Sequence, residues 1–188
     1  PDLPGSGASP LERPLSIEDM ADVLREVLDD AGIPRAVVIG HSMGGYAALA
    51  FAERYPGRLG GLGLFHSTAF ADTPEKKEGR LRAIEMMRTY GGPRFLRQMI
   101  PNLFTEAFRR AHPGVLADLV ARAEKAPPQA LALYYEAMRN RPDRTAVLRA
   151  CPEPVLFVIG AGDTAAPAAD MLQQVSMPAL SEVHLWEG

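Results

Sequence analysis

At 188 residues, the chain is long enough for one domain with a sizeable core and too short for two ordinary ones. Its 47% hydrophobic and 23% charged residues are typical of soluble globular proteins and exclude a disordered or membrane-spanning class. A formal net charge of -3, with Lys and Arg scattered among acids, excludes the basic surface that nucleic-acid binding requires.

The single cysteine and the start of the chain bear on its compartment. Cys151 has no second thiol with which to form a disulfide or a metal-binding pair, which favours a reducing compartment. No signal-peptide pattern follows Pro1, and the apolar run Pro154–Gly160 is far below the roughly 18 residues that a membrane helix needs. We therefore expect a cytoplasmic protein with no membrane contact, and the four histidines lack the grouped spacing of a metal site.

The first third of the chain predicts alternating helices and strands. An N-cap pattern followed by apolar residues at helical spacing predicts a helix from Ser16 to Gly32. Residues 36–40 are an apolar, β-branched run that predicts a buried strand, and residues 43–55 predict a helix. Residues 62–65 predict a second strand, so a right-handed parallel crossover is expected.

From about residue 73 to residue 150, charged and Met-rich helical segments are broken repeatedly by Gly and Pro, which indicates a helical insertion. The sheet resumes with strands over residues 154–160 and 182–186, and the opening residues 1–14 are expected to be a loop. The fold class is therefore α/β, in a single domain over residues 1–188.

A serine lies at the first junction between a predicted strand and a predicted helix. The sequence Gly40-His41-Ser42-Met43-Gly44 matches G-x-S-x-G, the nucleophile elbow of strand-turn-helix hydrolases. We expect the sharp turn to need small residues at 40, 44 and 45, and to strain the backbone of Ser42. The N–H of Met43, at the start of the helix, is expected to stabilise an oxyanion. A glycine-rich turn with an incidental serine is the alternative.

The sequence resembles the α/β-hydrolase superfamily, in particular lidded esterases and lactonases related to enol-lactone hydrolases. Two further segments carry the resemblance, Asp2–Ser9, which is similar to a D-x-x-G-x-G-x-S loop, and Glu53–Leu59 at the end of the helix after the serine. Ser6 departs from the bulky residue common in that loop. The resemblance implies a parallel-sheet fold with neighbouring strands and a helical lid at about 73–150.

Asp163 follows the strand over residues 154–160 in the sequence Gly160-Ala161-Gly162-Asp163, where the resembled family places its triad acid. Ordinary turn chemistry is the alternative for this aspartate. The family's base is a histidine after the last strand, and the chain stops at Gly188. His184 is expected to pack within the last strand, His41 to point away from the serine, and His112 to belong to the insertion.

The resemblance also implies that the family's first four strands and its catalytic histidine lie outside these 188 residues. We therefore expect a fragment or an incomplete record, with an unpaired edge on the first strand, that is unstable alone or needs a partner. We also expect that the chain alone does not hydrolyse esters through a triad, because none of its histidines is placed as the base. Strong Ser42-dependent turnover by the chain alone would instead point to His184 or His66 as the base.

The predicted function is hydrolysis of carboxylic esters, lactones or similar acyl substrates through Ser42 and an acyl-enzyme. A perhydrolase, a carbon–carbon bond hydrolase and a non-catalytic binding protein on the same fold remain alternatives. The partner is a small-molecule substrate, no cofactor is expected, and the oligomeric state is left open. The substrate is expected to meet some apolar or aromatic residues of the insertion and its flanks, from the set His66, Phe70, Met86, Met87, Leu96, Met99, Phe104, Tyr134 and Met138. The alternatives are that most of them pack the core of the insertion and that His66 has a capping or loop role.

Overall fold

The computed structural model describes residues 1–11, 15–125 and 127–187, which form two compact units. The first unit combines residues 17–71 with 141–187, and the second combines the described residues of 2–16 and 72–140. Residues 12–14 of the predicted opening loop lie outside the described residues, and the rest of that loop consists of turns and irregular backbone.

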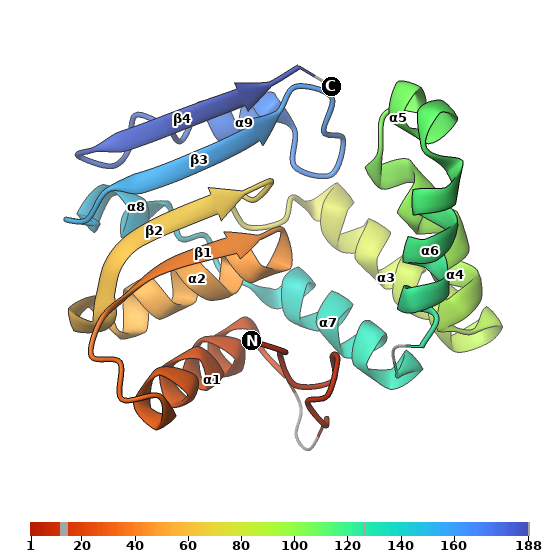
Figure 1. The fold of residues 1–188 in the computed structure, drawn as a ribbon, viewed down its shortest axis with the longest axis horizontal. Helices are drawn as coiled ribbons and strands as arrows, with labels where there is room; N and C mark the ends of the chain where they lie inside the picture. The colour runs from red at the N-terminus through yellow and green to blue at the C-terminus, as the bar shows by residue number, and fades with distance from the viewer. Residues whose placement is uncertain (12–14, 126, 188) are drawn as a thin grey trace. The chain divides into compact units, whose positions relative to one another are not determined.

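The first unit is built on a parallel sheet whose four described strands follow chain order (Figure 1). The strands are β1 (Ala36–His41), β2 (Leu59–Phe65), β3 (Val155–Gly160) and β4 (Ser181–Trp186). Each predicted strand is present, and β2 begins three residues before its predicted start at Leu62. The predicted α/β class with a parallel sheet is therefore confirmed.

The helices of the first unit are α1 (Ile17–Asp30), α2 (Met43–Arg54), η1 (Pro56–Arg58), α8 (Thr145–Ala150) and α9 (Ala168–Leu172). Helix α2 contacts β1 and β2, and its residues from Gly45 to Ala52 are buried. Four of these eight residues are alanine and one is glycine, and such small side chains let a helix lie close to a sheet. This close packing fixes the start of α2 against the end of β1.

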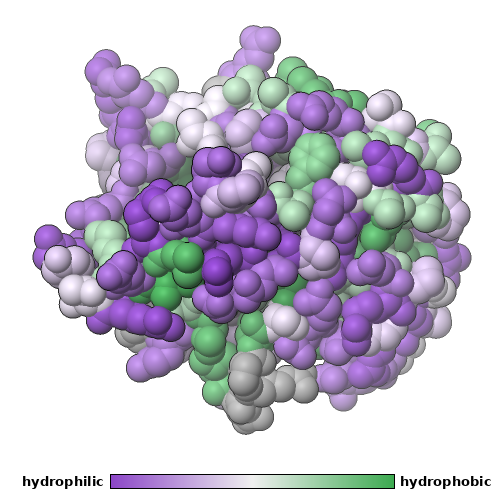
Figure 2. All heavy atoms as spheres, turned by 180° about the vertical axis from the view of Figure 1, so that it is seen from behind, coloured by the Kyte–Doolittle hydropathy of each residue, from purple (hydrophilic) through white to green (hydrophobic). Residues whose placement is uncertain are grey.

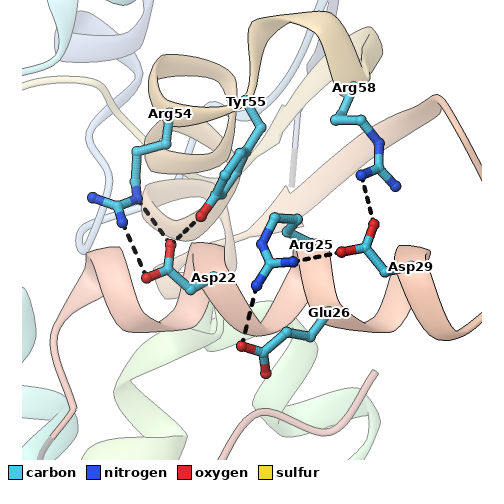
Figure 3. A network of polar contacts seen from close by, with 7 residues as sticks. All are labelled: Asp22, Arg25, Glu26, Asp29, Arg54, Tyr55 and Arg58. Carbon is cyan, nitrogen blue, oxygen red and sulfur yellow. Dashed lines mark hydrogen bonds and ion pairs between the residues drawn. The ribbon is translucent and has the colours of Figure 1, made fainter.

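Helix α1 is held to the end of α2 by a network of charged side chains (Figure 3). Asp22 accepts from Arg54 Nε at 2.9 Å and from Tyr55 Oη at 2.6 Å, while Asp29 accepts from Arg58 at 2.6 Å. Although burial acts to raise it, hydrogen bonds from Tyr55 and Arg54 lower the pKa of Asp22. The carboxylate form of Asp22 therefore stabilises the contact between the two helices.

Arg144 joins three parts of the first unit from a buried position. Its guanidinium bonds to Glu53 on α2 at 2.9 Å and also to Glu18 on α1, and its backbone N–H donates to Ala69 O at 2.8 Å. Both carboxylates reach solvent while the guanidinium is almost wholly enclosed. The chain that returns from the second unit is thus anchored before it enters β3.

The second unit is helical in its described part. Its helices are α3 (Pro74–Tyr90), α4 (Gly92–Met99), η2 (Ile100–Leu103), α5 (Glu106–Ala111), α6 (Pro113–Ala123) and α7 (Pro128–Asn140). Helices α3, α4 and η2 supply a core of buried apolar residues, against which α6 and α7 pack, and the core residues are Ile84, Met87, Phe95, Leu96 and Ile100. The unit ends at Asn140, and α8 packs against α2 in the first unit. The helical insertion at about 73–150 stays a prediction.

The opening loop packs on α7 within the second unit. Tyr134 Oη donates to Pro4 O at 2.7 Å, and Asp2 accepts from the N–H of Ala8 at 2.9 Å. Gly7 has φ 53°, and an added Cβ would lie 2.0 Å from the Asp2 carboxylate. The aspartate and the glycine of this loop therefore stabilise one compact turn.

Two surface properties agree with the composition. Within the described residues, no helix is both long enough and apolar enough to cross a membrane. Polar residues cover most of the face shown in Figure 2, with apolar residues scattered between them.

On the sheet, β1 is an edge strand and leaves Val37 and Ile39 largely exposed, at 65% and 59%. The prediction of a buried strand over residues 36–40 is therefore wrong in its burial, because β1 has a neighbouring strand on one side only among the described strands.

Candidate active site

Ser42 occupies the single position between β1 and α2, and its backbone is strained. Its φ of 51° and ψ of -117° are rare for a residue with a Cβ and cost about 1–3 kcal/mol. Its N–H donates to Phe65 O at 2.9 Å, and its carbonyl accepts from Gly45 N at 2.9 Å and from Ser67 Oγ at 2.8 Å. The residue is exposed. The strain predicted at this serine is confirmed.

The glycines around the serine differ in the space that they have. An added Cβ at Gly40 would lie 2.1 Å from Gly44 O, and one at Gly45 would lie 2.3 Å from Ser67 Oγ. An added Cβ at Gly44 would meet no heavy atom within 4 Å. The expectation that all three positions need a small residue is therefore wrong for Gly44, whose Cβ direction is open.

Met43 is the first residue of α2. The first N–H groups of a helix have no partner within it, and the helix dipole makes that end positive. This is the position that an oxyanion-binding N–H requires. The role itself stays a prediction.

Asp163 lies in the turn after β3, and both of its carboxylate oxygens have partners. Oδ1 accepts from the N–H groups of Ala165 at 2.8 Å and Ala166 at 2.9 Å. Oδ2 lies 2.6 Å from Nδ1 of His66. The carboxylate is thus fixed by its own turn on one side and directed at an imidazole on the other, so it does more than cap the turn.

His66 follows β2 and reaches Asp163 because the neighbouring strand leaves room for its ring. It has φ 48°, and its N–H donates to Val158 O at 3.0 Å. An added Cβ at Gly160 would lie only 2.6 Å from His66 Cε1, so the ring lies where a side chain at 160 would be. Sequence reasoning did not anticipate this pair. The signal was available, because β2 and β3 are neighbours in a parallel sheet and both residues follow their carboxyl ends.

The other histidines do not bond to Asp163. His41 forms an aromatic cluster with Phe65 and His66, its ring centroid 6.0 Å from that of His66. Burial, and then the nearby His66, lower the pKa of His41 against the opposing effect of Asp163, so His41 is neutral at pH 7. His184 lies in β4 as expected, but its side chain is exposed rather than packed, and His112 lies in the second unit between α5 and α6.

Most residues of the predicted substrate-contacting set pack within their own unit. Met87 and Leu96 belong to the core of the second unit, and Met86, Met99 and Phe104 pack against that core. Met138 accepts from Arg80 through its sulfur, and Tyr134 bonds to the opening loop. Phe70, in the first unit, offers its carbonyl to Arg141. Which of these side chains meet a substrate stays a prediction.

No three His, Cys, Asp or Glu side chains gather into a metal-binding group within the part of the chain that the structure describes. Chemically functional side chains lie at the carboxyl ends of β1, β2 and β3. They are an exposed, strained serine beside a helix start, and a carboxylate bonded to an imidazole.

The sequence profile of the Alpha/beta hydrolase family matches residues 1–188, the whole chain. The chain belongs to this family. A thermophilic esterase from Thermogutta terrifontis, solved with malate bound, superposes with a TM-score of 0.91 at 35% identity, over 98% of this chain and 69% of that one. The enol-lactonase from Burkholderia xenovorans LB400 superposes with a TM-score of 0.89 at 25% identity, over 99% of this chain and 70% of that one.

Among curated proteins, the pimeloyl-[acyl-carrier protein] methyl ester esterase of Aromatoleum aromaticum is 31% identical over 180 residues, 90% of this chain and 70% of that protein. Five other curated relatives match over only 42 to 49 residues, and the match spans 12% to 18% of their length. The predicted resemblance to hydrolases of the esterase and lactonase type is therefore confirmed.

Proposed function

We propose that this chain carries the nucleophile and the acid of a serine hydrolase that acts on carboxylic esters or lactones. Ser42 is the nucleophile, Asp163 is the acid, and the N–H of Met43 donates to the oxyanion. The observation that carries the proposal is the strained, exposed Ser42 at the start of α2, at the same edge of the sheet as the carboxylate of Asp163.

In the proposed reaction, Ser42 Oγ attacks the carbonyl carbon of the substrate while a base takes its proton. The tetrahedral oxyanion accepts a hydrogen bond from Met43 N–H. The carbon–oxygen bond to the alcohol breaks, the alkoxide takes the proton, and an acyl-enzyme remains. Water then attacks the acyl-enzyme, which releases the carboxylic acid and restores the Ser42 hydroxyl.

Two histidines compete for the role of the base. The resemblance assigns it to a histidine after the last strand, outside these 188 residues. His66 is supported by its bond to Asp163 through Nδ1, the nitrogen that meets the acid in a Ser-His-Asp triad, which leaves Nε2 for the serine proton. If the base is instead the histidine after the last strand, Asp163 would bond to that imidazole in place of His66.

The choice of esters and lactones follows the relatives that cover most of the chain, which are an esterase, an enol-lactonase and a methyl ester esterase. A perhydrolase or a carbon–carbon bond hydrolase would use the same three residues. We also propose that the helical second unit forms a lid, as the resemblance implies, and that a few of its apolar side chains contact the acyl group.

The test compares the 188-residue chain with its Ser42→Ala and Ser176→Ala variants. Ser176 is an exposed serine before the amino end of β4, so it controls for the loss of a hydroxyl elsewhere. Turnover of p-nitrophenyl butyrate and of a δ-lactone is measured, together with labelling by a fluorophosphonate, with and without added imidazole. Imidazole can supply a base from solution if the chain itself lacks one.

We expect Ser42→Ala to abolish labelling and turnover and Ser176→Ala to leave both unchanged. A His66→Gln variant then separates the two bases. If His66 is the base, the parent chain is active without imidazole and the variant is not. If the base lies elsewhere, imidazole restores Ser42-dependent turnover equally in both. Equal labelling of the parent chain and Ser42→Ala under both conditions would overturn the assignment of the nucleophile.

A further inference from the structure

A second serine, Ser67, is hydrogen-bonded to the backbone of the candidate nucleophile. Ser67 follows β2 by two residues and is wholly buried, at 0% exposure. Its Oγ donates to the carbonyl oxygen of Ser42 at 2.8 Å. A buried hydroxyl is retained only where it has such a partner, so this hydrogen bond accounts for a serine at position 67.

The end of β2 holds Ser42 from both sides of its α-carbon. Phe65 O accepts from the N–H of Ser42 at 2.9 Å, and Ser67 Oγ bonds to its carbonyl. Between these two contacts, His66 has φ 48°, which turns the chain so that one segment can reach both groups. The strain of about 1–3 kcal/mol at Ser42 requires such compensation, and each hydrogen bond contributes about 0.5–1.5 kcal/mol.

Ser67 also fills the space that a glycine on α2 leaves. An added Cβ at Gly45 would lie 2.3 Å from Ser67 Oγ and 2.5 Å from Ser67 Cβ. The two positions are therefore complementary in volume, and Ser67 approaches the first turn of α2 only because residue 45 has no side chain. This contact lets packing and hydrogen bonding be separated by experiment.

The segment that carries Ser67 is itself fixed by a buried amide. Gln174, at 0% exposure, donates to Thr68 Oγ1 at 2.7 Å and to Asp170 O at 2.7 Å, and accepts from Ala69 N at 2.7 Å. Asp170 lies on α9, which follows the turn of Asp163. The residues after β2 are thus tied to the segment that follows the candidate acid, and Ser67 has little freedom to move.

We propose that Ser67 is a positioning residue for the nucleophile: its hydroxyl fixes the carbonyl of Ser42 and so keeps Ser42 in its strained conformation. The role rests on the proposed function of Ser42. Ser67 is too buried to touch a substrate, and it acts only through the backbone of Ser42.

The test uses variants of the 188-residue chain that change the hydrogen bond and the volume separately. Ser67→Ala removes the donor, and Ser67→Cys keeps the bulk with a much weaker donor. Gly45→Ala introduces the clash, and the double variant Gly45→Ala with Ser67→Gly relieves it without a donor. Three quantities are measured, namely the Cα and Cβ chemical shifts of residue 42, the urea unfolding midpoint, and the initial rate of Ser42-dependent fluorophosphonate labelling.

We expect Ser67→Ala and Ser67→Cys to move the chemical shifts of Ser42 away from positive-φ values and to slow labelling by about five- to tenfold, the effect of one hydrogen bond. The double variant should regain stability relative to Gly45→Ala and still show displaced shifts and slow labelling. Unchanged shifts of residue 42 in both Ser67→Ala and Ser67→Cys would show that Ser67 only fills space. Recovery of shifts and labelling in the double variant would show the same. A parent chain without Ser42-dependent labelling, both with and without added imidazole, overturns the proposed function instead, and the chemical shifts still decide the role of Ser67.

Discussion

Alanine at position 40 should be far more damaging than alanine at position 44, although both glycines belong to the same motif. A Cβ at Gly40 would lie 2.1 Å from Gly44 O, 2.3 Å from Gly44 C and 2.4 Å from Gly45 N. All three are backbone atoms in the first turn of α2, so no change of rotamer relieves the contact. A Cβ at Gly44 meets no heavy atom within 4 Å.

The cost of Gly40→Ala depends on how far β1 and α2 must separate. Ordinary contact begins at 3.4 Å, so the shortest distance, 2.1 Å, requires about 1.3 Å of displacement. Overpacking of a rigid interior costs about 1–3 kcal/mol, and a contact made only with backbone lies at the upper end or beyond. Gly44→Ala gains about 0.5–1 kcal/mol, because alanine stabilises a helix relative to glycine.

Thermal and urea unfolding followed by circular dichroism measure the difference. For a domain of this size, about 1 kcal/mol corresponds to about 2–4 °C, so we expect Gly40→Ala to lower Tm by about 6–12 °C. Gly44→Ala should raise Tm by about 1–4 °C. Equal effects of the two substitutions would refute the reasoning, since they would mean that the strand and the helix do not meet at Gly40.

Three further outcomes follow from the structure. Because the pKa of Asp22 is lowered, its carboxylate stabilises the fold above about pH 4 and the contribution disappears as the pH falls through the lowered value. Asp22→Asn should therefore lose about 1 kcal/mol at pH 7 and less as the pH falls below about 4, measured by urea unfolding. Arg144→Ala should cost about 2–4 kcal/mol of unfolding free energy, against less than about 0.5 kcal/mol for Arg82→Ala at an exposed position. Similar losses in the two variants would contradict the stabilising role of the buried Arg144 ion pairs. If the helical unit is a lid, Phe104→Trp should change the KM ratio of long to short p-nitrophenyl esters while Tm stays within a few degrees, and an unchanged ratio would count against Phe104 as a contact.

The strands could be predicted because parallel strands buried on both faces are continuous apolar runs in the sequence. Residues 154–160 have this pattern, and the structure places β3 there. Residues 36–40 have it too and form β1, but Val37 and Ile39 are largely exposed, so the burial predicted for this strand is wrong. The start of β2 was missed because Gly60 and Gly61 weaken the strand pattern. In the sheet, Gly61 pairs with Val37, whose side chain occupies the space beside it. Glycine is suitable at position 61 because the side chain of Val37 on the neighbouring strand takes up this space, and the sequence does not show which residue pairs with Gly61.

The candidate nucleophile was predictable because its determinants are local in sequence. The strand, the turn and the helix around Ser42 lie within residues 36–55, and the motif fixes their order. The open surroundings of Gly44 were not predictable in the same way. Sequence spacing shows which residues lie near the turn, whereas the direction of each Cα–Cβ vector depends on the helix geometry that follows it.

The contacts of Asp163 required two predictions to be combined. His66 and Asp163 are 97 positions apart, yet each follows the carboxyl end of its strand, and the register places Phe65 beside Val158. Carboxyl ends of parallel strands meet at one edge of the sheet, so loops that are distant in sequence converge there. The missing information was the adjacency of β2 and β3 and the space above Gly160.

The loop after β2 therefore contacts both halves of the candidate site. Phe65 O and Ser67 Oγ hold the backbone of Ser42, while the His66 side chain between them bonds to Asp163. A change of backbone at residues 65–67 would move the nucleophile and the partner of the acid together. It follows that an intact motif around Ser42 and an intact Asp163 are insufficient to specify reactivity, because the relative placement of the two residues depends on a third segment that neither motif contains.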